Sequence, residues 1–574
     1  MVFITIRYTC FFLPAKYMSL NPASHAHSAI DVIDGTVSEF YNVMDECIRK
    51  SEVMPGMYKT ITSPSYSNNC PIAESSFTNV DIGCPAPQII DIDNSFITAE
   101  INVPITIPSG FTVNNNASAF FVGWKSSLDA IGRYIIYCNH KVVYDQVYVG
   151  EESFILQSLI PEHVRCRKPQ QYTTYDNASS FSENVCGTYV ILSTADDESA
   201  PVDIGEKTFT VKIPIKIDIS QFLLFQNFKY LPGFCGKWTI RLYPSTQNII
   251  FCAVNPRAVM SKSDSIAFNN INMDDYSHYF VQRGDKLTML TKYDKITKPI
   301  ASSSVEFKTV TLDVGKCTVD NVLLHQTQFE LMYDIYDSLK SRYMQRPLTI
   351  PVNKLDYGRF SGHMGDSQTS STYTAAISNV ESLFILPFID DNHHTVCVNP
   401  MFENLYMNIS GYGNYPQQPF DTYGNDEKHM RFINMTLDAL NINNSPIMAP
   451  NKDLMNSLEN DKIHFNRFDG VNVSTFSKSF NNNRHDISNF IIGIPFSNDI
   501  DFQGGLTSYG NINIKLSASS SQISKVIEKL TGEEKQTTSK IGATVMMCKD
   551  CALMIKPIPY VDQPECRLID ERIV

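Results

Sequence analysis

The chain is poor in charge and in helix-forming stretches. Charged residues make up only 19% of its 574 residues, and runs rich in alanine or glutamate are scarce. Asparagine, serine, threonine, tyrosine and phenylalanine are abundant instead, and there are 29 prolines. Aromatic and β-branched side chains favour strands, whereas asparagine, serine and proline favour turns. We therefore predict a mainly β protein, and 43% of apolar residues excludes a disordered chain.

The chain also lacks a hydrophobic run long enough to span a membrane. The apolar stretch from Met1 to Leu13 is too short, contains Arg7 and leads into Pro14. It has no small-residue cleavage site, so a signal peptide is poorly supported, and Met1 and Met18 both stay open as the start. We expect no membrane span.

An excess of positive charge is absent as well. The formal net charge is −13, from 60 acidic and 47 basic residues, and no basic stripe stands out. Proteins that neutralise nucleic-acid phosphates over a broad surface are usually basic or carry such a stripe. We therefore expect no strong direct nucleic-acid binding.

The cysteines show no regular spacing. The fourteen cysteines are scattered, and Cys548 and Cys551 form the only Cys-x-x-Cys pair. A zinc site would need a second pair or suitably spaced histidines. Cys138, Cys252 and Cys397 lie in apolar strand-like runs, where a free thiol behaves as a small hydrophobe. These features predict no metal site and reduced, structural cysteines, as in a protein made in a cytosol or nucleus.

Catalytic motifs are missing too. The most ligand-like cluster consists of Asp390, Asp391, His393 and His394. It lies where a hairpin loop is expected, so we interpret it as a solvated turn. Gly411-Tyr-Gly413 begins like a dinucleotide fingerprint, but Pro416 stands where the third glycine belongs and no helix follows. With no Walker A, G-x-S-x-G or H-E-x-x-H sequence, we assign no catalytic, cofactor-binding or metal-binding residues and expect no cofactor.

What the chain does have is period-two alternation. Apolar residues alternate with polar ones at Ile97–Ile107, Phe209–Ile217, Trp238–Leu242, Leu405–Ile409 and Ile512–Leu516. Such a pattern predicts antiparallel strands with one buried and one solvated face. Asn139–His140 separates two strand-like runs and predicts a tight hairpin.

One segment has helical spacing instead. From Phe329 onward the apolar residues recur in steps of three and four, and Arg346–Pro347 ends the pattern. A second short helix is predicted at Ile523–Leu530, closed by Gly532. We place the boundary between two halves of the chain near residue 346.

A weak internal repeat supports two similar halves. The first half contains Phe209–Ile215 followed by Gly236–Leu242, and the second contains Phe490–Phe496 followed by Gly510–Leu516. In both, an apolar–Pro–apolar strand end precedes a glycine that opens an alternating strand. Two consecutive sandwich domains with matched connectivity explain this order.

Three blocks carry a family resemblance. The stretches from Phe121 to His140, from Phe209 to Tyr243 and, more loosely, from Val380 to Pro416 resemble the major capsid proteins of Polinton (Maverick) elements and virophages. The similarity extends over most of residues 86–560. Residues 1–85, 256–285 and 533–540 match nothing in that family.

The resemblance implies a double jelly roll of two eight-stranded sandwiches. It implies a subunit that trimerises into pseudo-hexameric capsomers and tiles an icosahedral shell around a double-stranded DNA genome. The expected partners are further copies of the chain and a penton or minor capsid protein, and the expected location is the virion capsid, assembled inside the host cell. The family has no catalytic residues, so no enzyme activity is expected.

We expect the following domains: an N-terminal arm at 1–85, a first jelly roll at 86–327 with an insertion at 256–285, a connecting helix at 328–346, and a second jelly roll at 347–574. The main alternative is a β-sandwich carbohydrate-binding protein or glycoside hydrolase, which would carry a secretion signal and paired cysteines. A structural adhesin, the other alternative, would show near-identical repeats.

Overall fold

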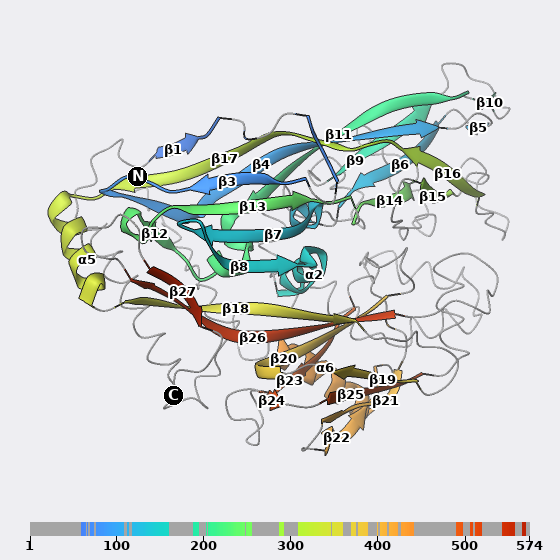
Figure 1. Cartoon of the computed structure of the whole chain (residues 1–574). Helices are drawn as coiled ribbons and strands as arrows, with labels where there is room; N and C mark the ends of the chain where they lie inside the picture. Colours follow the sequence, from blue (N-terminus) through green and yellow to red (C-terminus); the bar gives the residue numbers. More distant parts are fainter. Residues whose placement is uncertain are drawn as a thin grey trace, which may run out of the picture.

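The structure is a computed structural model that describes residues 59–569 with gaps. The longer gaps are 160–186, 255–285, 292–307, 441–489 and 519–541, and shorter ones separate several strands. The helix predicted at Ile523–Leu530 and the insertion predicted at 256–285 lie outside the described residues. Figure 1 shows a first half, drawn above, that packs along a second half, with one helix joining them at the left edge.

The first half is built around a large antiparallel sheet. Its core order is β1-β17-β4-β11, with β1 at Lys59–Thr62, β17 at Thr318–Glu330, β4 at Gln88–Ile107 and β11 at Lys207–Asp218. Ile101, Val103 and Ile105 of β4 have no exposed surface, while the residues between them are partly exposed. The alternation predicted at Ile97–Ile107 is thereby confirmed.

A second sheet packs against the first. Its order is β3-β13-β7-β8, with β3 at Thr78–Ile82, β13 at Trp238–Pro244, β7 at Ile131–Cys138 and β8 at Lys141–Val147. Asn139 and His140 join β7 to β8 with φ angles of 49° and 69°, the left-handed geometry of a tight hairpin turn. The predicted hairpin is confirmed, and Trp238 faces the core as expected.

Further short strands belong to the first half, and several of them extend it at one end (Figure 1). These are β2 (Cys70–Pro71), β5 (Thr112–Val113), β6 (Ala117–Gly123), β9 (Gly187–Ser193), β10 (Val202–Asp203), β12 (Tyr230–Pro232), β14 (Ile250–Val254), β15 (Lys286–Thr291) and β16 (Lys308–Val314). Its described residues also include the 3₁₀ turns η1 (Ser127–Ala130), η2 (Ile219–Gln221), η3 (Leu223–Phe225) and η4 (Gly233–Cys235). Strands β14, β6 and β9 form a small sheet of their own.

The second half repeats the arrangement. One sheet has the order β18-β26-β20-β23, with β18 at Leu348–Arg359, β26 at Gly542–Lys556, β20 at Ile377–Phe388 and β23 at Ile492–Pro495. The other has the order β19-β25-β21-β22, with β19 at Thr369–Thr374, β25 at Asn511–Ala518, β21 at Phe402–Ile409 and β22 at Gly413–Phe420. Two more strands pair with the first sheet: β24 (Leu506–Ser508) with β20, and β27 (Glu565–Ile569) with β26.

The two halves share one connectivity. When the eight core strands of each half are counted along the chain, one sheet has the order first, eighth, third, sixth and the other second, seventh, fourth, fifth. A helix follows the fifth strand in both: α2 (Val149–Leu159) and α6 (Glu427–Ala439). The repeat found in the sequence is confirmed, because β11 and β23 are both the sixth strand and β13 and β25 both the seventh.

The joining helix, α5, starts later than predicted. It covers Tyr333–Gln345, and Tyr336, Leu339 and Tyr343 are its buried residues. Phe329 belongs to β17 instead, because its backbone is paired with Ile89 of β4. Strand pairing over this stretch overrides the helical spacing of the side chains.

The first sandwich also begins earlier than the boundary expected at residue 86. Strand β1 pairs with β17, and β3 pairs with β13, so residues from Lys59 onward already belong to its two sheets. Its last strand continues to Glu330, beyond the expected start of the connecting helix at 328.

The buried apolar side chains of the two halves form one cluster. It includes Ile240 and Phe225 of the first half and Leu355 and Ile494 of the second. Among the described residues, no helix is long and apolar enough to cross a membrane.

Candidate functional site: the sandwich junction and an outer sheet face

The first half covers one sheet edge of the second half, and we call this contact the junction. Among the described strands, β18 is an edge strand of its sheet and pairs with β26 on one side only. On its other side the Tyr144 hydroxyl donates to the Asn353 carbonyl at 3.1 Å, and the Asn227 side-chain amide donates to the Pro351 carbonyl at 2.8 Å. Uncovered edges invite unwanted strand pairing, so these contacts both join the halves and protect the edge.

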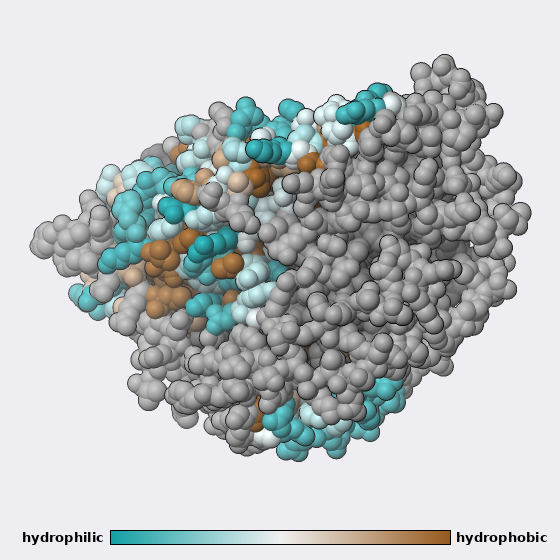
Figure 2. Space-filling view, turned by 45° about the vertical axis from the view of Figure 1, so that its right-hand side comes forward, coloured by the Kyte–Doolittle hydropathy of each residue, from teal (hydrophilic) through white to brown (hydrophobic). Residues whose placement is uncertain are grey.

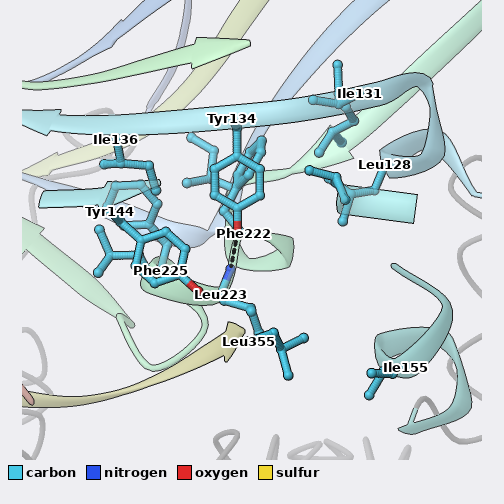
Figure 3. Packing of buried hydrophobic residues seen from close by; sticks show 14 of the residues in the cluster. Leu128, Ile131, Tyr134, Ile136, Tyr144, Ile155, Phe222, Leu223, Phe225 and Leu355 are labelled. Carbon is cyan, nitrogen blue, oxygen red and sulfur yellow. Dashed lines mark hydrogen bonds between the residues drawn. The ribbon is translucent and has the colours of Figure 1, made fainter. Parts of the chain in front are cut away.

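Apolar packing reinforces these hydrogen bonds. Tyr148, which follows β8, stacks on Tyr357 of β18 with ring centroids 3.5 Å apart and planes at 17°. Leu355 of the same strand is buried, and Figure 3 shows it below Leu223 and Phe225 of the first half. The junction is therefore part of the protein core, and the two halves form one packed unit.

A buried carboxyl group lies in the first half close to this junction. Glu152 of α2 has no exposed surface, and its carboxyl accepts a hydrogen bond of 2.8 Å from the Tyr134 hydroxyl. The same hydroxyl accepts a bond of 3.3 Å from the backbone N–H of Leu223 (Figure 3). Burial raises the pKa of Glu152 to about 8, although the bond from Tyr134 opposes the shift.

This environment argues against a catalytic role for Glu152. Burial also raises the pKa of Tyr134 well above its usual range, and the charge of Glu152 adds to that shift. A protonated carboxyl with no solvent contact can hold Tyr134 and α2 in place, but it cannot meet a substrate. We interpret the pair as structural.

The outer face of the β3-β13-β7-β8 sheet is a second candidate surface. Here the Arg241 guanidinium lies 4.4 Å from the Phe77 ring centroid and 4.8 Å from that of Tyr137. Arg133 lies 5.6 Å from the Tyr243 ring and forms a two-bond ion pair with Asp145, at 2.9 and 2.5 Å. Interfaces between proteins are enriched in arginine and aromatic residues of this kind.

Exposed apolar side chains border these pairs. Phe77 is 44% exposed, and Val142 and Val147 of β8 are 59% and 44% exposed. Figure 2 shows one face of the molecule on which hydrophobic and hydrophilic side chains lie in small adjoining groups. A surface of this mixed character suits repeated contacts between folded subunits better than insertion into an apolar phase.

The residues considered for chemistry in the sequence lie as follows. Cys548 and Cys551 are buried on β26, in register with Leu355 and Val352. Gly413 begins β22 with a φ of 88°, in the hairpin after β21, so the Gly-Tyr-Gly stretch leads into a strand and not into a helix. The Asp390–His394 cluster lies outside the described residues. Within the described part of the chain, no group of three or more His, Cys, Asp or Glu residues could hold a metal ion.

The shared strand order of the two halves decides the fold. An eight-stranded sandwich with the two sheet orders found here is a jelly roll. The chain is a double jelly roll. This is the fold that the family resemblance implied, and the predicted fold class is confirmed.

Three solved structures of viruses or of their capsid proteins are similar to this chain. A structure of the Sputnik virophage is similar over 90% of both chains, with 13% identity and a TM-score of 0.47. The mavirus major capsid protein is similar over 90% of this chain and 91% of its own, with 10% identity and a TM-score of 0.45. The Faustovirus major capsid protein is similar over 93% of this chain and 99% of its own, with 9% identity and a TM-score of 0.36. No family model and no curated protein matches the sequence.

Proposed function

We propose that this double jelly roll is a major capsid protein. It forms homotrimers with a pseudo-hexagonal outline, and these tile an icosahedral shell around a double-stranded DNA genome. The observation that carries the proposal is the presence of two jelly rolls with the same strand order, fused through one continuous core. A rigid subunit of this kind presents two similar walls, so a threefold assembly presents six, and such an outline packs with its neighbours on a shell.

The chemistry of the chain fits a structural subunit and not an enzyme. Glu152, a carboxyl group of the first jelly roll whose pKa burial raises to about 8, is sealed from solvent, and the mixed outer face carries arginine–aromatic pairs. The proposed partners are other copies of the chain, neighbouring capsomers and a vertex or minor capsid protein. The net charge of −13 supports a shell that encloses nucleic acid without strong direct binding to it. We place the protein in the virion capsid, assembled inside the host cell.

The molar mass in solution tests the proposal. The purified chain is expected to elute as a stable species of three times its 64.8 kDa mass, and electron microscopy is expected to show capsomers or closed shells. A monomer that binds glycans on an array would contradict the proposal and favour the carbohydrate-binding alternative.

Two alternative substitutions of Phe77 test whether the outer face of the β3-β13-β7-β8 sheet takes part in this assembly. Phe77→Asp removes the exposed ring from the Arg241 guanidinium and places a charged carboxylate among the exposed apolar side chains, so we expect weaker association between subunits or capsomers. Phe77→Tyr keeps the ring against Arg241 and serves as the control. Equal association of both variants and the unmodified chain would exclude this face as a contact surface.

A further inference from the structure

The last strand of the chain brings two distant cysteines together. Strand β27 pairs with β26 through residues Ala552–Lys556, and Cys566 lies opposite Ile555 in that pairing. The Cys566 sulfur is 2.9 Å from the sulfur of Cys138, on β7 of the first jelly roll. The two residues are 428 positions apart in the sequence and belong to different jelly rolls. Two thiols at this distance are positioned to react with each other.

The two thiols differ in accessibility. Cys138 is 1% exposed, and its thiol is also within 3.8 Å of the Cys235 carbonyl. The contact with Cys566 and burial both raise the pKa of Cys138, so this thiol keeps its proton. Cys566 is only partly buried. A soluble oxidant can therefore reach Cys566 first, with Cys138 behind it as the second thiol.

Nearby cysteines are poor competitors for this reaction. Cys235 is fully buried, and burial raises the pKa of its thiol well above the usual value. Burial likewise raises the pKa of Cys84 to about 12. Neither thiol is therefore expected to attack the oxidant before Cys566 does, and as the second thiol Cys138 has the advantage of its 2.9 Å contact with the Cys566 sulfur.

We propose that Cys138 and Cys566 form a redox-controlled disulfide that fastens the C-terminal strand to the first jelly roll. With oxidised glutathione as the oxidant, the Cys566 thiolate attacks one of its sulfurs and releases one glutathione thiolate. The Cys138 thiol then attacks the Cys566 sulfur, and its proton passes to the departing sulfur, so that the second glutathione leaves as a thiol. In total the two cysteine thiols lose two electrons and two protons, and one molecule of oxidised glutathione is reduced to two molecules of glutathione.

The consequence of the bond is a covalent link across the junction. Closing a loop of this length restricts the unfolded chain far more than the folded one, so the oxidised form resists unfolding. If the chain is a capsid protein as proposed above, the link forms when particles leave the reducing interior of the cell, and the shell is stabilised after assembly.

Peptide mapping tests the bond directly on the unmodified full-length chain. The protein is purified with reductant, equilibrated with a mixture of oxidised and reduced glutathione, and alkylated at its remaining thiols. Trypsin together with a protease that cuts after glutamate leaves Cys138 in the peptide Tyr134–Lys141 and Cys566 in the dipeptide Cys566–Arg567. We expect these two peptides to be joined, with a loss of about 2 Da for the pair of thiols. Alkylation of both cysteines, or a bond from Cys138 to Cys235, would overturn the proposal.

Thermal unfolding provides the second measurement. Oxidation should raise the melting temperature of the unmodified chain by several degrees, and Cys566→Ser should abolish that difference. Cys70→Ser is the matched control, because Cys70 is also partly buried but lies on β2, and its variant should keep the full difference. A retained difference in Cys566→Ser would contradict the bond. Neither measurement requires trimers, so failure here is distinguishable from failure of the capsid proposal.

Discussion

The sixth strands of the two jelly rolls occupy the same place in the fold, but one buries a single face and the other buries both. Strand β11 alternates between exposed and buried residues, whereas every residue of β23 is buried. The difference comes from α6, which packs on β23: the Thr436 hydroxyl accepts a bond of 3.2 Å from the backbone N–H of Gly493. Alternation in the sequence therefore marks a strand with one solvated face, and a continuous apolar run marks a strand covered on both faces.

One aligned position makes the contrast sharp. In the internal repeat, Lys212 of β11 corresponds to Gly493 of β23. The Lys212 side chain is 68% exposed and lies 3.3 Å from the Glu100 carboxylate. A Cβ atom added at Gly493 would lie 2.7 Å from the Ala439 Cβ and 3.1 Å from the Thr436 Cα, so only glycine fits beneath the helix.

Exchanging these two residues is the most severe test of the comparison. Gly493→Lys forces a long charged side chain between β23 and α6, and we expect a loss of about 4 kcal/mol or more in the free energy of unfolding. Lys212→Gly removes an exposed side chain and its surface ion pair with Glu100, and should cost about 0.5–1 kcal/mol. Equilibrium denaturation of both variants measures the difference. Similar losses at the two positions would show that α6 does not cover β23 as described.

The helices that follow the fifth strands offer a second contrast, because α2 carries the buried carboxyl group of Glu152. Its effect on stability should depend on pH. Helix α2 carries Glu152, with a pKa of about 8 in the folded protein against 4.5 when exposed. The folded state therefore binds a proton that the unfolded state has lost between these values. The free energy of unfolding should fall as pH rises from about 4.5 to about 8, by up to about 5 kcal/mol, and stay constant in this contribution above pH 8.

Glu152→Gln isolates that effect, because glutamine accepts the bond from Tyr134 but does not ionise in this range. We expect the unmodified chain to lose stability relative to Glu152→Gln between pH 5 and pH 9. Urea denaturation at several pH values provides the comparison. Parallel stability profiles for the two proteins would mean that Glu152 is not protonated in the folded state.

The smallest expected effect concerns the junction. Tyr144→Phe leaves the Asn353 carbonyl without its donor from the first jelly roll, which should cost about 1–2 kcal/mol. Tyr148→Phe keeps the stack on Tyr357 and should change stability by less than about 0.5 kcal/mol. Unfolding monitored by denaturant measures both, and an unchanged Tyr144→Phe variant would argue that the edge of β18 is satisfied in another way.

Much of the fold was predictable from local pattern. The alternation at Ile97–Ile107, the Asn139–His140 turn and the paired Phe209 and Phe490 blocks each depend on neighbouring residues, and the structure confirms each of them. The boundary at residue 86 and the helix start at Phe329 were wrong because strand pairing with distant residues decides them. A short strand such as β1 carries no signal of its own until β17 pairs with it.

The candidate sites were less predictable. Nothing in the sequence near Glu152 distinguishes it from Glu151 beside it, and only the packing of α2 beside Tyr134 seals it from water. The approach of Cys138 and Cys566 spans almost the whole chain, and neither residue belongs to a spaced motif. Pairs of this kind have a spatial but no sequential signature.

By itself, then, the sequence determined a mainly β chain of two similar halves and the inward-facing residues of most strands. Period-two burial and turn geometry are properties of a few adjacent residues, which explains why they can be read locally. The tertiary structure alone decided which strand edges are covered, which carboxyl is kept protonated and which thiols meet. Those features depend on surfaces that come together only when the two jelly rolls pack.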